Sequence, residues 1–94
     1  MNSAKLIEIL SEKKSSHSLN IHQEALWHIH EDSWEKAHNL VQDESDSLSC
    51  LIHAYLHKLE GDTWNANYWY SRADSPPLQM SNKEEWEYLA NKAL

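Results

Sequence analysis

Hydrophobic residues recur every three or four positions along most of the chain, which is the spacing of one face of an α-helix. In the first such stretch, Leu6, Ile7 and Leu10 share a face that the neighbouring charged residues avoid. Most stretches begin at Ser, Asn or Asp, which favour helix starts. The pattern predicts six helices, at about Ser3–Lys13, Asn20–Glu31, Trp34–Asp43, Ser47–Glu60, Thr63–Asp74 and from Asn82 almost to the C-terminus.

The breaks between these stretches fit a helical protein. Gly61 is the only glycine, and we expect it to end the fourth helix in the left-handed conformation. Asp62 then opens the fifth helix, with Asn65 placed to return the hydrogen bond in a variant of the capping box. The adjacent Pro76 and Pro77 end that helix, and so few breakers argue against a β protein with many turns. A chain of 94 residues holds one domain, so we expect a single all-α domain over residues 1–94.

The charge and composition of the chain argue against several functional classes. The net charge is −7 and there is no basic stripe, so we expect neither a nucleic-acid partner nor an anionic membrane surface. Cys50 is the only cysteine, which excludes an intrachain disulfide and fits a reducing compartment, so we expect a cytoplasmic protein. The short N-terminal apolar run contains Glu8, which does not fit a signal peptide, and no segment approaches transmembrane length.

A repeat is present in the middle of the chain. The first segment reads Cys50-x2-His53-Ala54-x2-His57, in which large residues surround the small Ala54. The second segment reads Ala66-x3-Tyr70-x2-Ala73 and is followed by the prolines. This pattern resembles the tetratricopeptide (TPR) repeat, in which small residues let the two helices of a hairpin approach closely. The turn GDTWNA at 61–66 also resembles the turn of that family.

Two further copies are incomplete. One contains DSWEKA at 32–37 but has Glu44 where a small residue belongs, and the other is the half repeat Trp86-x2-Leu89-Ala90-x2-Ala93, typical of a capping helix. The resemblance covers roughly Leu19–Leu94. It implies a short TPR-like right-handed stack of antiparallel helix hairpins, with a C-terminal capping helix and an added N-terminal helix. The string HAYLHKLEGDTWNANYWYSRA is also similar to a set of small uncharacterised bacterial proteins, which implies nothing about activity.

Histidines form a stripe on the fourth predicted helix. Cys50, His53, His57 and Glu60 share one side, and the spacing of His53 and His57 would let two imidazoles meet one metal ion. The stripe also coincides with the side expected to face the fifth helix, and no loop supplies a second pair of ligands. We therefore expect His53 and His57 to be buried against the fifth helix, hydrogen-bonded and without a metal. Cys50 with His53 could form a nucleophile and base, but the chain lacks a glycine-rich turn for an oxyanion hole, so we expect no catalytic residues.

Aromatic residues divide between two sides of the fifth predicted helix. Ala66, Trp69 and Tyr70 fall on the side toward the fourth helix, and Trp64 and Tyr68 fall on the other, with Arg72 in line beyond Tyr68. If that side is open to water, Trp64, Tyr68 and Arg72 form a binding surface. The alternatives are that the first helix or the acidic loop covers them, or that Arg72 simply stacks on Tyr68.

These observations favour a non-enzymatic protein-interaction or scaffold module, with a protein partner or a second copy of the chain. The alternative is a small-ligand or metal-binding protein that uses the stripe of His53, His57 and Glu60. A hydrolase ranks third. No cofactor is expected.

Overall fold

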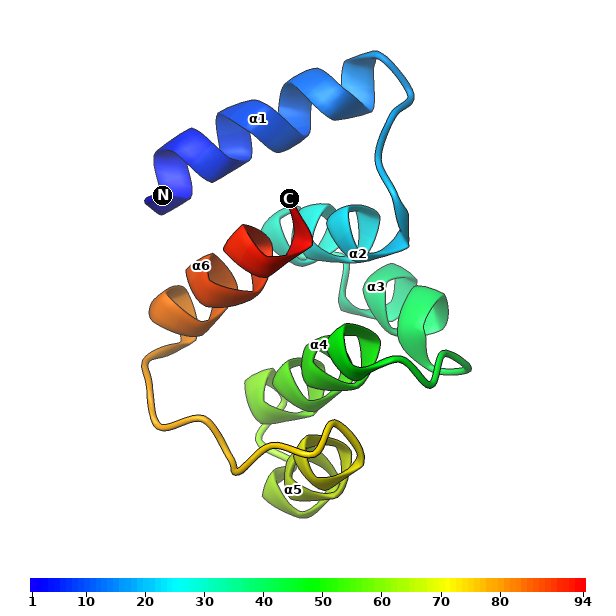
Figure 1. Ribbon diagram of the computed structural model, residues 1–94, viewed down its shortest axis with the longest axis vertical. Helices are drawn as coiled ribbons and strands as arrows, with labels where there is room; N and C mark the ends of the chain where they lie inside the picture. Colours follow the sequence, from blue (N-terminus) through cyan, green and yellow to red (C-terminus); the bar gives the residue numbers. More distant parts are fainter.

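The computed structural model describes residues 1–94 as six helices with no strand (Figure 1). This confirms the prediction of an all-α fold, and every predicted helix is present. The third and fifth helices each end two residues earlier than predicted. The helices are α1 (Ser3–Ser15), α2 (Ile21–His30), α3 (Trp34–Val41), α4 (Ser47–Leu59), α5 (Thr63–Arg72) and α6 (Asn82–Ala93).

The starts of the helices follow from their caps. In five of the six helices the side chain before the first turn accepts a hydrogen bond from a backbone N–H of that turn, which supplies a partner that the helix lacks. Ser33, before α3, makes no such bond. The predicted return bond of Asn65 is wrong, because its amide donates to the Asp62 carboxylate at 2.6 Å. The side chain of Asn is one methylene shorter than that of Gln or Glu, which normally reach the backbone N–H of the cap.

Four helices end in the same way. Gly61 has φ +81° after α4, as predicted, and His17, Asp32 and Asp74 take the same left-handed conformation after α1, α2 and α5. At each end the next N–H donates to the carbonyl five residues earlier, as from Asp62 to His57 at 2.9 Å and from Ser75 to Tyr70 at 3.0 Å. This pairing is the Schellman motif, which gives the last turn of a helix its missing donors.

The helices stack along the long axis of a molecule that measures 36 × 25 × 21 Å. Two hairpins, α2–α3 and α4–α5, pack against each other through α3 and α4. The C-terminal helix α6 returns to contact α1, α2 and α4, and α1 covers α2 and α6. As a result α1 and α5 form opposite ends of the molecule (Figure 1). The TPR-like arrangement of these hairpins stays a prediction.

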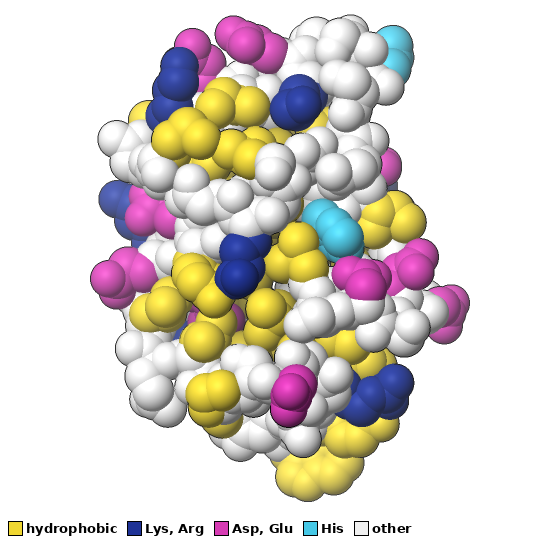
Figure 2. All heavy atoms as spheres, viewed as in Figure 1, with side chains coloured by type: hydrophobic (Ala, Val, Ile, Leu, Met, Phe, Trp, Pro, Cys, Tyr) yellow, Lys and Arg dark blue, Asp and Glu magenta, His cyan; other side chains and the backbone are white.

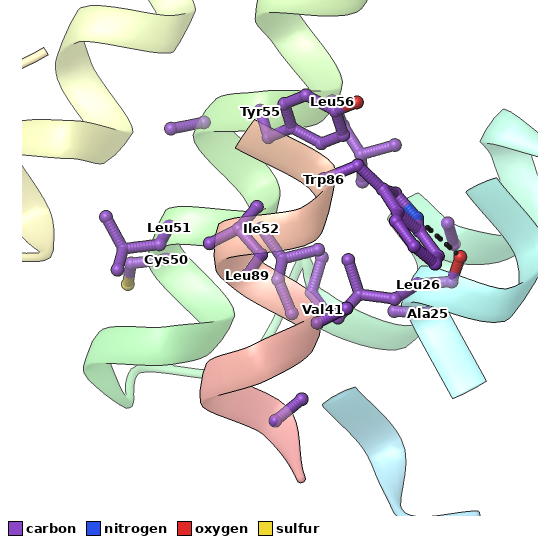
Figure 3. Close-up of a cluster of buried hydrophobic side chains, with 14 of the residues drawn as sticks. Ala25, Leu26, Val41, Cys50, Leu51, Ile52, Tyr55, Leu56, Trp86 and Leu89 are labelled. Carbon is purple, nitrogen blue, oxygen red and sulfur yellow. Dashed lines mark hydrogen bonds between the residues drawn. The ribbon is translucent and has the colours of Figure 1, made fainter. Parts of the chain in front are cut away.

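The core lies where α2, α3, α4 and α6 meet (Figure 3). Ile52 of α4 and Leu89 of α6 are fully buried there beside Val41. Trp86 enters from α6 and donates its indole N–H to the carbonyl of Leu26 at 3.0 Å, so its one polar group is satisfied inside the core. This bond fixes α6 on α2.

A buried polar network joins α6 to the second hairpin. Glu85 of α6 is completely buried, and it accepts hydrogen bonds from the Tyr70 hydroxyl of α5 and from the Lys58 ammonium of α4, the latter at 2.6 Å. Lys58 also donates to the carbonyls of Leu78 and Met80 in the linker before α6. The buried carboxylate is therefore paired, as a charge in a low-dielectric interior must be.

Candidate functional site

The outer side of α5 carries two exposed aromatic side chains. Trp64 is 75% exposed and Tyr68 is 44% exposed, so this side of the helix is open to water. Their rings lie nearly parallel, at 11°, with centroids 6.2 Å apart. Hydrophobic side chains are visible at the end of the molecule formed by α5 (Figure 2). Their exposure shows that neither the first helix nor the acidic loop before α4 covers them, and α1 lies at the opposite end of the molecule.

Arg72 completes this surface. Its guanidinium donates to the Tyr68 hydroxyl at 3.0 Å and lies 5.9 Å from the centre of the Tyr68 ring. It also lies 5.3 Å from the centre of the Trp69 ring. The predicted stacking of Arg72 on Tyr68 is therefore present, and it occurs at the surface. We call Trp64, Tyr68 and Arg72 the α5 patch.

A second candidate site lies between α3 and α4. His53 and His57 of α4 stack one turn apart, with ring centroids 4.9 Å apart. His38 of α3 meets both rings edge-on, at 4.6 Å from His53 and 5.5 Å from His57. Each of the three offers a ring nitrogen within 4.8 Å of the others. We call these three residues the histidine cluster.

Two tryptophans enclose the histidine cluster. Trp34 of α3 stacks on His38 at 4.8 Å, and Trp69 of α5 stacks on His53 at 3.9 Å. The expected burial against the fifth helix therefore holds for His53, which is 3% exposed. The side chain of His57 is also largely buried, at 12% exposure, but the expected neighbour is wrong, because this ring faces Trp34 and His38 of α3. The residue lies one turn farther along α4, beyond the reach of the Trp69 stack.

Hydrogen bonding separates the roles of the three rings. Nδ1 of His57 lies 2.7 Å from a carboxylate oxygen of Glu60. A carboxylate only accepts, so Nδ1 of His57 carries a proton, and Nε2 is the ring nitrogen that remains available to another partner. Nδ1 of His53 is buried and has no hydrogen-bond partner, which contradicts the expectation that the buried histidines are hydrogen-bonded. The stack against Trp69 satisfies the ring faces but offers nothing to the nitrogen.

Burial favours the neutral form of His53 and His38. Desolvation, reinforced by His38 and His57, lowers the pKa of His53 to about 4. Desolvation and His57 also lower the pKa of His38, although Glu60 opposes the shift. Neutral imidazoles have free lone pairs, which is the form that binds metal ions.

His38 is a member of the cluster that was not predicted from the sequence. It lies four positions after Trp34, and this spacing puts the two rings on one side of α3. That signal predicts that His38 points inward. It does not show that α3 faces His53 and His57.

Cys50, the candidate nucleophile, is 1% exposed in the core. Burial raises the pKa of its thiol, so the reactive thiolate is disfavoured.

An open hollow of about 590 Å³ lies elsewhere, between α5 and the linker before α6. Lys58, Ala66, Tyr70 and Leu78 are among its lining residues. Lys58 bonds to the linker, Tyr70 bonds to Glu85, and Ala66 is buried in the hairpin, so these residues have structural roles. The hollow therefore follows from the way the linker passes over α5.

Comparison with protein-family models, with curated proteins and with solved structures finds no match. No helix combines the length and the apolar character that a membrane span requires. The α5 patch and the histidine cluster are therefore the basis for a proposed function.

Proposed function

We propose that the protein is a non-enzymatic interaction or scaffold module with a short TPR-like stack of helix hairpins. It binds a protein partner, or a second copy of itself, through the α5 patch. The exposure of Trp64 carries this proposal, because a tryptophan in water is the part of the surface that gains most from being covered.

The residue types of the α5 patch support binding. Trp, Tyr and Arg are the side chains that most often dominate the energy of protein interfaces. The patch is also held in one arrangement, since Arg72 is bonded to the Tyr68 hydroxyl and Trp64 is parallel to the Tyr68 ring. Side chains that are already ordered lose less entropy on binding, and this favours affinity.

The position of α5 supports binding as well. Among the helices, α4 makes the main contact with α5, and the side that carries Trp64 and Tyr68 is open for a partner. Within α5 the only formal charge belongs to Arg72, although the whole chain carries −7.

A non-enzymatic role fits the buried, protonated state of Cys50. The single free cysteine also supports a reducing compartment, and we place the protein in the cytoplasm, in a bacterium according to the resemblance stated above. The runner-up role, ligand binding by the histidine stripe, uses other residues.

The test compares Trp64→Ala with Tyr88→Ala, which removes another exposed aromatic ring, on α6. Size-exclusion chromatography with light scattering measures self-association, and crosslinking in cell extract measures capture of a partner. We expect the parent and Tyr88→Ala to self-associate, or to capture a partner, with equal affinity. Trp64→Ala should bind at least tenfold more weakly, since a hot-spot truncation costs about 2 kcal/mol or more. Equal behaviour of all three proteins would overturn the proposal.

A further inference from the structure

We propose that His38, His53 and His57 together bind one divalent transition-metal ion, zinc being the best match, and that this ion links α3 to α4. The proposal goes beyond the interaction function, because it concerns the buried side of the α4–α5 hairpin. It also differs from a site made of His53, His57 and Glu60, in which α3 has no part.

The geometry is close to what zinc requires. Zinc takes imidazole nitrogens at about 2.0–2.1 Å in a tetrahedron, which places two ligand atoms about 3.3 Å apart. The three histidines offer nitrogens within 4.8 Å of one another. Small rotations of the rings would therefore bring them onto one ion without moving a helix. His53 and His57 are four residues apart on α4, so the helix itself sets their separation.

The unpaired nitrogen of His53 points to a missing partner. Leaving a buried polar atom without a hydrogen bond costs about 1–3 kcal/mol. Nδ1 of His53 is in this state. A metal ion that accepts a lone pair from this ring, or draws it to a new rotamer, removes that cost.

Glu60 orients one ligand for the ion. Its carboxylate accepts the Nδ1 proton of His57 at 2.7 Å, so the Nε2 lone pair of His57 is left for the metal. A carboxylate behind a metal-bound histidine is a frequent outer partner, and it raises the basicity of the ring. Glu60 is thus a positioning residue.

A competing cluster, formed by His57, Glu60 and Asp62, is less suited to an ion. The Asp62 carboxylate already accepts two bonds from Asn65, at 3.2 Å and 2.6 Å, as the cap of α5. Glu60 is engaged by His57 and its side chain is 40% exposed. Three imidazoles between two indoles form the drier and more selective set of ligands, with a fourth position open to water.

The role of the ion follows from its position. The contact of α3 with α4 is the junction between the two hairpins. An ion held by His38 on one side and by His53 and His57 on the other fixes that junction and stabilises the folded state by mass action.

The experiment uses untagged protein, because a polyhistidine tag would bind the same ions. The protein is stripped with a chelator, dialysed and titrated with zinc chloride by calorimetry, while thermal unfolding is followed with and without zinc. We expect one ion per chain and a higher melting temperature. Cobalt chloride should give the intense visible absorption of a tetrahedral site.

Matched variants then assign the ligands. We expect His38→Gln to abolish the one-ion binding and Glu60→Gln to weaken it by about 10–100-fold. His17→Gln, in an exposed histidine outside the cluster, and Asp62→Asn, in the competing cluster, should bind as the parent does. Circular dichroism confirms that each variant is folded.

Three results would overturn the proposal: no saturable zinc binding, binding that survives His38→Gln unchanged, or binding that Asp62→Asn removes. X-ray absorption at the zinc edge of the parent protein gives a reading independent of any variant. Three imidazole ligands support the site, and a shell with fewer than three imidazoles contradicts it.

Discussion

The imidazole of His53 lies flat on the indole of Trp69, with ring centroids 3.9 Å apart and the planes inclined by 15°. Tyr68, in turn, meets the same indole edge-on at 5.2 Å. Trp69 therefore touches the histidine cluster on one side and the α5 patch on the other. The two candidate sites are neighbours that share one side chain.

The buried state of His53 predicts a loss of stability in acid. Its pKa is about 4 in the folded protein, against about 6.5 in an unfolded chain. The unfolded chain therefore binds a proton at a pH where the folded protein does not. The contribution of His53 to the free energy of unfolding is fully present above about pH 6.5 and is lost as the pH drops toward 4. We expect urea denaturation, with a chelator present, to show about 2 kcal/mol less stability at pH 5 than at pH 7.

The control for this prediction is His53→Phe, which keeps a ring against Trp69 but cannot titrate. Its stability should depend less on pH over the same range, with the remainder arising from His38, whose pKa is also lowered. A parent protein that is equally stable at both pH values would show that His53 is not held neutral by the fold.

Two tryptophans should differ sharply in their contribution to stability. Trp64 is 75% exposed, so we expect Trp64→Ala to change the free energy of unfolding by no more than about 0.5 kcal/mol. Trp86 is 7% exposed and bonded to the Leu26 carbonyl, so Trp86→Ala should cost about 3–5 kcal/mol. Urea denaturation measures both, and similar values for the two variants would contradict the burial described here.

The buried network around Glu85 should depend on the Tyr70 hydroxyl. Tyr70→Phe keeps the ring but leaves the carboxylate with one hydrogen bond fewer, and we expect a loss of about 1–3 kcal/mol. Tyr88→Phe removes a hydroxyl from a ring that is 38% exposed and should be nearly neutral. If the two variants unfold at the same denaturant concentration, the bond from Tyr70 to Glu85 contributes nothing to stability.

The close approach of α4 and α5 should not tolerate a larger side chain at Ala66. This residue is 3% exposed, so we expect Ala66→Leu to destabilise the fold by about 1–3 kcal/mol through overpacking. Asn67→Leu adds a side chain of the same size at the next, exposed position and should have little effect. A calorimetric melting temperature for Ala66→Leu equal to that of Asn67→Leu would rule out a tight contact.

Much of the helical structure follows directly from the sequence. The periodic positions of Leu6, Leu10 and Leu89 become core positions, because each segment has one side where apolar residues gather. The αL end of α4 was also predictable, because Gly61 is the only glycine. The equivalent ends at His17, Asp32 and Asp74 were not, since residues with a side chain adopt that conformation only where the surrounding bonds impose it.

The candidate sites were predictable to different degrees. The spacing places Trp64 and Tyr68 opposite Ala66 and Tyr70 on one short helix, but it left open whether another element covers them. The histidine cluster does not, because His38 lies fifteen positions before His53 and meets it only through the packing of two hairpins. The spacing along one helix predicts which residues share a side, and it carries no information about which neighbour that side meets.

The return of α6 to α1, α2 and α4 has a kinetic consequence. The hairpins α2–α3 and α4–α5 join residues that are close in sequence and form early, whereas Trp86 bonds to a carbonyl sixty residues upstream. A ribosome releases α6 after the other five helices, so Ile52 of α4 lacks its neighbour Leu89 until α6 arrives. We therefore expect the two hairpins to pack loosely during synthesis and the twelve-residue α6 to complete the packing around Ile52.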